Sequence, residues 1–157
     1  MKSNFDFLSR DFPVLANFGK LAEQYCFSDA NSCLIKLGMI GENIVNLIFT
    51  YDGIDLPYDN TAVTRIDTLM REGLLTRDLC DILHAIRKAR NKATHENYGS
   101  TDEAKTLLQM TYSLCEWLCR LTEIGIIRIN RLLCHLKQRC QIMLWPIKNR
   151  KRNLKMN

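Results

Sequence analysis

The stretch "SDANSCLIKLGMIGENIVNLIFTY", residues 28–51, is the longest apolar segment of the chain and decides its fold. Its apolar residues recur at spacings of three and four, which places them on one face of an α-helix. Ser28 and Asp29 precede this run and suit the N-cap position. The stretch therefore predicts a long helix, from about Ser28 to Tyr51, that forms the centre of the core. Its core-facing residues are Cys33, Leu34, Leu37, Ile40, Ile44, Leu47, Ile48 and Tyr51.

A second amphipathic segment precedes this helix. Pro13 suits the first turn of a helix, because its missing N–H would have no partner there. The segment after Pro13 predicts a helix with one apolar side. That side comprises Val14, Leu15, Phe18, Leu21, Ala22 and Tyr25.

Three more helices are predicted after the central one. A turn-rich stretch, residues 52–60, leads to a short helix over about residues 61–71, which Gly73 ends. The next helix runs from Thr76 to about His95, before the terminating sequence Asn97-Tyr98-Gly99. The last opens at residue 100 with the capping-box pattern Ser-Thr-Asp-Glu and continues as an amphipathic helix. Its predicted core side comprises Leu107, Leu108, Thr111, Leu114, Cys115, Leu118 and Cys119.

Composition agrees with this pattern. The chain of 157 residues is 46% hydrophobic, enough to bury one core, and it has only 7 Gly and 3 Pro. These features predict an all-α protein, a bundle of four to five helices with a basic C-terminal extension.

Charge divides the sequence into two regions. Residues 1–123 contain 13 Lys and Arg against 17 Asp and Glu, whereas residues 124–157 contain 9 Lys and Arg and no acid. We therefore predict a helical domain over 1–123 and a separate basic segment over 124–157. The basic segment is either an amphipathic helix that grips nucleic acid or an acidic membrane surface, or an unselected, non-native or disordered extension. Its densest cluster of cations comprises Lys148, Arg150, Lys151 and Arg152.

The cysteines and the N-terminus indicate in which cellular compartment the protein is expected. The 7 cysteines include no C-x-x-C pair, and several lie at helical spacing among Leu and Ile, which favours buried thiols over disulfides. The N-terminus has no apolar signal region, and there is no run of about 18 apolar residues. A cytoplasmic protein without a membrane span is expected. Cys134, His135 and Cys140 lack a second ligand pair, so neither a metal site nor a cofactor is predicted.

The helix over residues 76–95 has two different faces. Leu79, Ile82, Leu83, Ile86, Ala89 and Ala93 form the apolar face, and His84, Lys88, Asn91 and His95 lie almost opposite. Arg90 lies at the margin of the apolar face. A cation in that position extends to water, pairs with an acid, or is sealed against another subunit.

The motif "RNKATH", Arg90 to His95, resembles the signature of the HEPN superfamily of small helical domains. In many members of that superfamily the arginine, its polar neighbour and the histidine carry out metal-independent RNA cleavage, usually across a homodimer. The resemblance implies these roles for Arg90, Asn91 and His95. The chemistry is plausible, because an arginine fork clamps a phosphate and a histidine accepts a proton from a 2′-hydroxyl.

A broader resemblance covers about residues 3–121. Two segments, "SNFDFLSRDFPVLANFGKLAEQYCFSDANSCLIKLGMIGENIVNLIF" and "LMREGLLTRDLCDILHAIRKARNKATHENYGSTDEAKTLLQMTYSLCEWLCR", look like the N-terminal helical domain of the R subunit of type I restriction enzymes. The chain has no G-x-x-x-x-G-K-[ST] loop, so we do not expect it to cleave or translocate DNA. The resemblance ends where the basic segment begins, which favours a shortened or frameshifted R-subunit gene.

Three functions remain open at this stage. The first is a module, expected to be a homodimer formed through the helix over residues 76–95, that binds nucleic acid or another restriction-system subunit. Its expected contacts are Arg87, Lys88, Lys92 and the basic cluster. The second is a toxin-like endoribonuclease, and the third is a remnant without activity. Arg90 and His95 are five residues apart and so lie about 140° apart on a continuous helix. Cleavage would therefore require either unwinding before His95 or a homodimer formed through this helix.

Overall fold

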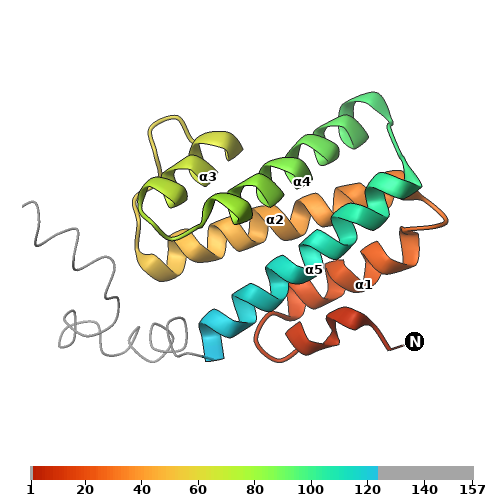
Figure 1. The fold of residues 1–157 in the computed structure, drawn as a ribbon, viewed down its shortest axis with the longest axis horizontal. Helices are drawn as coiled ribbons and strands as arrows, with labels where there is room; N and C mark the ends of the chain where they lie inside the picture. Colours follow the sequence, from red (N-terminus) through yellow and green to blue (C-terminus); the bar gives the residue numbers. More distant parts are fainter. Residues whose placement is uncertain (1, 124–157) are drawn as a thin grey trace, which may run out of the picture.

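Helix α2 (Ala30–Asp52) runs through the middle of the structure, in agreement with the prediction from residues 28–51. The computed structural model describes residues 2–123, and within them α2 packs against every other α-helix (Figure 1). The side chains of Leu34, Leu37, Ile40 and Ile44 are completely buried. Burial of such apolar side chains is the main stabilising contribution to a bundle of this size, so α2 is the centre of the core.

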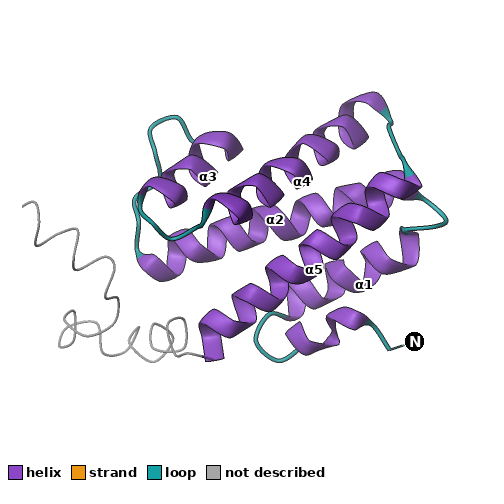
Figure 2. Ribbon diagram, viewed as in Figure 1, coloured by secondary structure: helices purple, strands orange, loops and turns teal. Residues whose placement is uncertain are grey.

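The remaining α-helices confirm the all-α prediction. They are α1 (Pro13–Tyr25), α3 (Ala62–Arg71), α4 (Arg77–Glu96) and α5 (Thr101–Glu123). Residues 2–123 contain no β-strand, as Figure 2 shows by colour. In Figure 1, α3 and α4 lie on one side of α2, while α1 and α5 lie on the other.

Polar side chains cap the starts of these helices. The side chains of Asp29, Thr61 and Thr76 accept hydrogen bonds from backbone N–H groups in the first turns of α2, α3 and α4. Ser100 accepts one from the N–H of Glu103 at 3.4 Å, which is one half of the predicted capping box. Each of these side chains satisfies a donor that has no partner within its own helix. Short polar residues thus fix the helix starts that the sequence predicts.

The segment before α1 was not predicted to be helical. Asn4–Leu8 forms a 3-10 helix, η1, which buries Phe5 and Leu8, and Ser3 caps it. Phe5 lies directly over Gly19 of α1, where an added Cβ would come within 2.2 Å of the Phe5 ring. The glycine therefore lets η1 close one side of the core. A five-residue element is too short to show a helical period in sequence.

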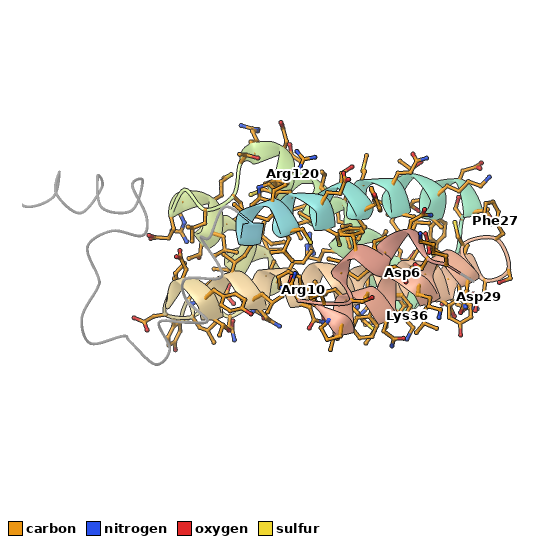
Figure 3. The ribbon with its side chains drawn as sticks, turned by 90° about the horizontal axis from the view of Figure 1, so that it is seen from below. Asp6, Arg10, Phe27, Asp29, Lys36 and Arg120 are labelled. Atoms are coloured by element: carbon orange, nitrogen blue, oxygen red, sulfur yellow. The ribbon has the colours of Figure 1, made fainter. Side chains whose placement is uncertain are left out.

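The predicted apolar side of α1 was wrong at one position. Val14 is 56% exposed, whereas Leu15 and Ala22 are buried. Val14 lies in the first turn of α1, at the end of the helix, and the buried residues of this helix begin at Leu15. The turn from α1 to α2 brings Phe27 and Asp29 to one end of the bundle (Figure 3), and the ring of Phe27 lies 5.0 Å from the Lys105 ammonium of α5.

Two expectations about the core can be checked in the described residues. None of the five described cysteines is in a disulfide, and Cys26, Cys33, Cys80 and Cys115 are buried. Helix α2 is long and apolar enough to cross a membrane, but 56% of the relevant window is buried inside the bundle. Such burial is typical of a core helix. The length and composition of α2 are therefore only weak evidence for a membrane span.

Candidate functional site

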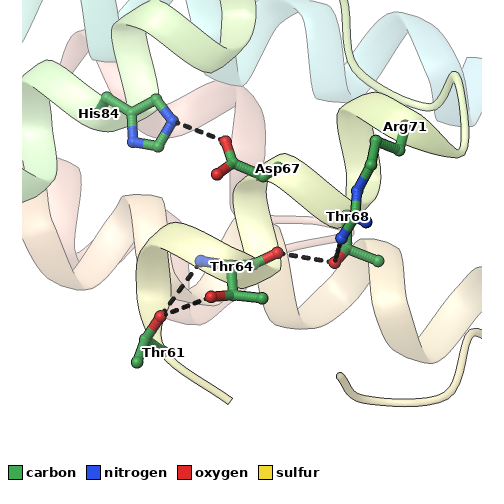
Figure 4. Close-up of polar contacts among 6 residues, drawn as sticks. All are labelled: Thr61, Thr64, Asp67, Thr68, Arg71 and His84. Carbon is green, nitrogen blue, oxygen red and sulfur yellow. Dashed lines mark hydrogen bonds and ion pairs between the residues drawn. The ribbon is translucent and has the colours of Figure 1, made fainter. Parts of the chain in front are cut away.

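Helix α4 has the two faces that its sequence predicts. Leu83, Ile86, Ala89 and Ala93 are buried, and the opposite side carries more exposed polar residues. On that side the His84 ring nitrogen Nε2 lies 3.3 Å from a carboxylate oxygen of Asp67 in α3 (Figure 4). His84 therefore joins α4 to α3 and has a structural partner.

Arg90 forms an ion pair with an acid on the central helix. Its Nη1 atom lies 3.1 Å from Oε1 of Glu42, and the two side chains are 35% and 46% exposed. The sequence leaves three environments open for Arg90: water, an acidic partner, or another subunit. In the described residues Arg90 pairs with an acid. A pair this exposed contributes at most about 1 kcal/mol, because water and salt screen it. Glu42 therefore positions the Arg90 guanidinium but binds it weakly enough for a ligand to compete.

A glycine on α2 brings Arg90 to this position. An added Cβ on Gly38 would lie 2.2 Å from Cγ and 2.6 Å from Cβ of Arg90. The absence of that Cβ lets the stem of Arg90 lie directly on the backbone of α2. Gly38 thus lets α4 approach closely and holds the guanidinium beside Glu42.

The structure does not bring Arg90 and His95 together. Helix α4 continues unbroken to Glu96, so the two side chains point about 140° apart. Of the two routes to cleavage, unwinding before His95 is absent from this structure, and the homodimer stays a prediction. Asn91 is half-buried and His95 exposed, and they share a face because they are four residues apart.

The C-terminal end of α4 is held by the start of α2. The side-chain amide of Asn31 donates hydrogen bonds to the carbonyl oxygens of Ala93, at 2.7 Å, and Tyr98, at 2.8 Å. Asn97 adopts a left-handed conformation, with φ of 50°, and its N–H bonds to the Lys92 carbonyl. These contacts satisfy carbonyls that a helix end leaves without partners, so the segment around His95 is fixed.

A pocket between α2, α3 and α4 gathers three arginines. Arg65 of α3 and Arg87 and Arg90 of α4 line it, together with Glu42 of α2. Arg65 also bonds through Nη2 to the Asn46 side chain and lies 5.5 Å from the Phe49 ring centroid. The apolar part of the lining comprises Val45, Ile66, Leu83 and Ile86. Among the charged residues, Glu42 and Arg65 were missed by sequence reasoning, because they come from helices other than α4.

Comparison with known proteins identifies the family of this chain. Residues 20–138 match the family described as "Domain of unknown function (DUF4145)", which is more than half of the chain. The chain belongs to this family. The match of the DUF4145 domain extends past Glu123 into the basic segment.

One curated relative of this DUF4145 domain has a described role. The chain is 25% identical over 120 residues to the type I restriction enzyme EcoKI endonuclease subunit of Escherichia coli K12. The aligned region covers 76% of this chain but only 10% of that subunit. The similarity supports a restriction-related domain, and no solved structure matches the chain.

The remaining predicted contacts of the DUF4145 domain fall into two groups. Lys88 and Lys92 are exposed on α4, and the Lys92 ammonium lies 5.6 Å from the Tyr98 ring centroid. The cluster of Lys148, Arg150, Lys151 and Arg152 lies outside the described residues, as do the Cys134, His135 and Cys140 side chains. Residues 2–123 contain no group of three or more His, Cys, Asp or Glu side chains placed to hold a metal ion.

Proposed function

We propose that this DUF4145 domain is a HEPN-like binding module, related to the N-terminal module of a type I restriction enzyme R subunit. In this role it binds nucleic acid or another subunit of a restriction system, in defence against foreign DNA. The similarity to an endonuclease subunit over a tenth of that subunit's length supports the proposal. The buried thiols are compatible with the reducing cytoplasm in which we expect the domain to act.

The relation between Arg90 and His95 favours binding over catalysis. Within one chain, Arg90 lies beside Glu42 and points away from His95. RNA cleavage through these residues needs both groups within hydrogen-bonding reach of one phosphodiester. A single chain in this conformation cannot supply that arrangement, but its cations can still bind phosphates.

Positive charge supplies the binding chemistry. Lys88 and Lys92 are exposed on α4, and residues 124–157 add 9 cations without a single acid. Lys and Arg that neutralise phosphates release condensed counterions, so the affinity falls as salt rises. We therefore expect nucleic-acid binding with a steep dependence on salt concentration.

Fluorescence anisotropy with labelled duplex DNA and single-stranded RNA tests this function. We expect a weaker salt dependence when Gln replaces Lys148, Arg150, Lys151 and Arg152. The slope of log affinity against log salt concentration should become less negative by roughly one unit per lost phosphate contact. Lys20→Gln, on the exposed side of α1, is the matched control and should leave the slope unchanged. A full chain that binds neither nucleic acid at low salt would leave only the subunit-binding form of the proposal, tested by co-purification with the other restriction subunits.

The alternative function is a stand-alone, metal-independent endoribonuclease. Exposure of His95 and its shared face with Asn91 favour it, because a second protomer packed along α4 could bring its own Arg90 to that face. Incubation of the purified chain with RNA in EDTA distinguishes the two. Cleavage that disappears in both His95→Ala and Arg90→Ala, while the homodimer persists in sedimentation, would establish the nuclease; intact RNA at high protein concentration supports the binding module.

A further inference from the structure

Arg87 is a half-buried cation without a counter-charge in the described part of the chain. Its Nε atom is buried and has no hydrogen-bond acceptor. The ion pairs of His84 with Asp67, Arg90 with Glu42, and Lys105 with Asp102 do not include Arg87. A buried guanidinium N–H is stabilised when an anion or another acceptor replaces the water that it has lost. Arg87 therefore has a donor that an anion in the pocket would satisfy.

The rest of the sequence cannot supply a side-chain carboxylate for Arg87. Residues 124–157 contain no Asp and no Glu. Glu42, the acid that lines the same pocket, is already paired with Arg90 at 3.1 Å. Neither the glutamate of the pocket lining nor any side chain of residues 124–157 therefore offers Arg87 a free carboxylate.

The pocket around Arg87 is built to receive an anion. Arg65 approaches from α3, and its Nε atom is also buried without an acceptor. Three arginines and one glutamate give the lining a net charge of +2. Nη2 of Arg65 is held by Asn46 and the stem of Arg90 lies on Gly38, so two of the three guanidinium groups are fixed in place before any ligand arrives. Such preorganisation lowers the entropic cost of binding.

We propose that the pocket formed by Arg65, Arg87 and Arg90 binds a phosphate monoester dianion. A guanidinium presents paired N–H donors that match the oxygens of a phosphate. The two negative charges of the dianion balance the net charge of the lining, whereas a single carboxylate would leave one positive charge uncompensated. Arg90 donates to the ligand when Glu42 releases it, and Glu42 holds that guanidinium in position when the pocket is empty.

Two sources can supply this chemistry. One is free inorganic phosphate, and the other is the terminal phosphate of a nucleotide or of a nucleic-acid end. The proposal does not require that the domain binds nucleic acid along its length, because either source fills the same pocket.

Isothermal titration calorimetry of the full chain tests the pocket, with inorganic phosphate, adenosine 5′-monophosphate, adenosine and malonate as probes. Arg87→Met keeps the aliphatic stem and should weaken binding of phosphate or of the nucleotide roughly tenfold or more. Arg77→Met, on the exposed first turn of α4, is the matched control and should bind as the parent does. Binding of the nucleotide but not adenosine, more tightly than phosphate, identifies the terminal-phosphate source; phosphate at least as tight as the nucleotide identifies the free anion.

Glu42→Gln gives an opposite and independent readout. It removes the competing acceptor of Arg90 and raises the net charge of the lining by one, so phosphate should bind more tightly, by roughly threefold or more. This variant also guards against an Arg87→Met chain that fails to fold. Phosphate affinity unchanged by both Arg87→Met and Glu42→Gln assigns the binding to other cations and overturns the proposal. Absence of phosphate and nucleotide binding, or tighter binding of malonate than of phosphate, would also overturn it.

Discussion

The side chain of Asn31 donates a hydrogen bond of 2.7 Å to the backbone carbonyl of Ala93, sixty-two residues further along the chain. This bond ties the first turn of α2 to the last turn of α4. The site that carries Arg90 and His95 is therefore fixed at one end by a polar contact and along its length by the close approach at Gly38. Substitutions at Asn31 and at Gly38 test these two contacts separately.

Asn31→Ala should destabilise the domain by about 1 to 3 kcal/mol, because it leaves the carbonyls of Ala93 and Tyr98 without their amide donor. Urea denaturation followed by circular dichroism measures the change. Thr106→Ala is the control, since the exposed Thr106 hydroxyl bonds only within its own helix, and a change of at most about 0.5 kcal/mol is expected. Equal effects of the two substitutions would show that Asn31 does not hold the end of α4.

Gly38→Ala and Gly41→Ala should have opposite effects, although they lie three residues apart on the same helix. At Gly38 the new Cβ would meet the base of the Arg90 side chain at 2.2 Å, so α4 must move, at a cost of about 1 to 3 kcal/mol. At Gly41 the nearest atom, in Ile86, is 3.4 Å away. Alanine there should be neutral or stabilising by up to about 1 kcal/mol, because it favours helix.

Thermal and urea unfolding of both variants measure the difference. Gly38→Ala should also perturb the environment of Arg90, which a phosphate titration of this variant detects as a weaker affinity. A stable Gly38→Ala variant with parental phosphate binding would contradict the role of Gly38 as the contact that positions Arg90.

The pair of Glu42 and Arg90 should contribute little to folding. A double-mutant cycle with Glu42→Gln and Arg90→Met is expected to give a coupling free energy below about 1 kcal/mol. The coupling should decrease with added salt, because both side chains are more than a third exposed. A salt-independent coupling of about 2 kcal/mol or more would mean that the pair is a structural lock and that Arg90 is not available to a ligand.

Buried thiols should make the domain sensitive to alkaline pH. Burial raises the pKa of the Cys33 thiol to about 12, and burial together with the neighbouring Cys119 does the same for Cys115. In the unfolded chain both thiols ionise near pH 9, so the stability that they contribute is complete below pH 9 and falls as the pH rises towards 12. The loss should be roughly 1 kcal/mol per thiol at pH 10.

Urea denaturation at pH 7.5 and pH 10 measures this loss. The double variant Cys33→Ala and Cys115→Ala is less stable at both values but should lose about 2 kcal/mol less than the parent between them. An identical pH dependence in the two proteins would show that these thiols are not protected in the folded state.

The sequence predicts the helices well, because their starting points depend on local chemistry. Asp29, Thr61 and Thr76 act as caps where their side chains suggest it, and the left-handed Asn97 ends α4 where the turn sequence predicts an end. Element η1 was missed because a single short turn has no periodic pattern. Local signals are thus sufficient for elements that are long enough to repeat.

The site was only partly predictable, because it depends on how helices pack. The position of Arg90 at the margin of the apolar face is visible in sequence, and the structure confirms it. Its partner Glu42 and its neighbour Arg65 lie on other helices, and no local pattern indicates which turns of α2 and α3 face α4. The glycine at position 38 was the available signal, since a glycine within a helix often marks a close approach of two backbones.

The contact between Gly38 and Arg90 also restricts how this domain can change during evolution. An insertion or deletion of one residue between Thr76 and Arg90 would rotate every later side chain of α4 by about 100°. Arg90 would then leave the gap at Gly38 in which its stem lies, and Ala93 would leave Asn31. Relatives that keep the pocket should therefore differ in this interval by substitution alone.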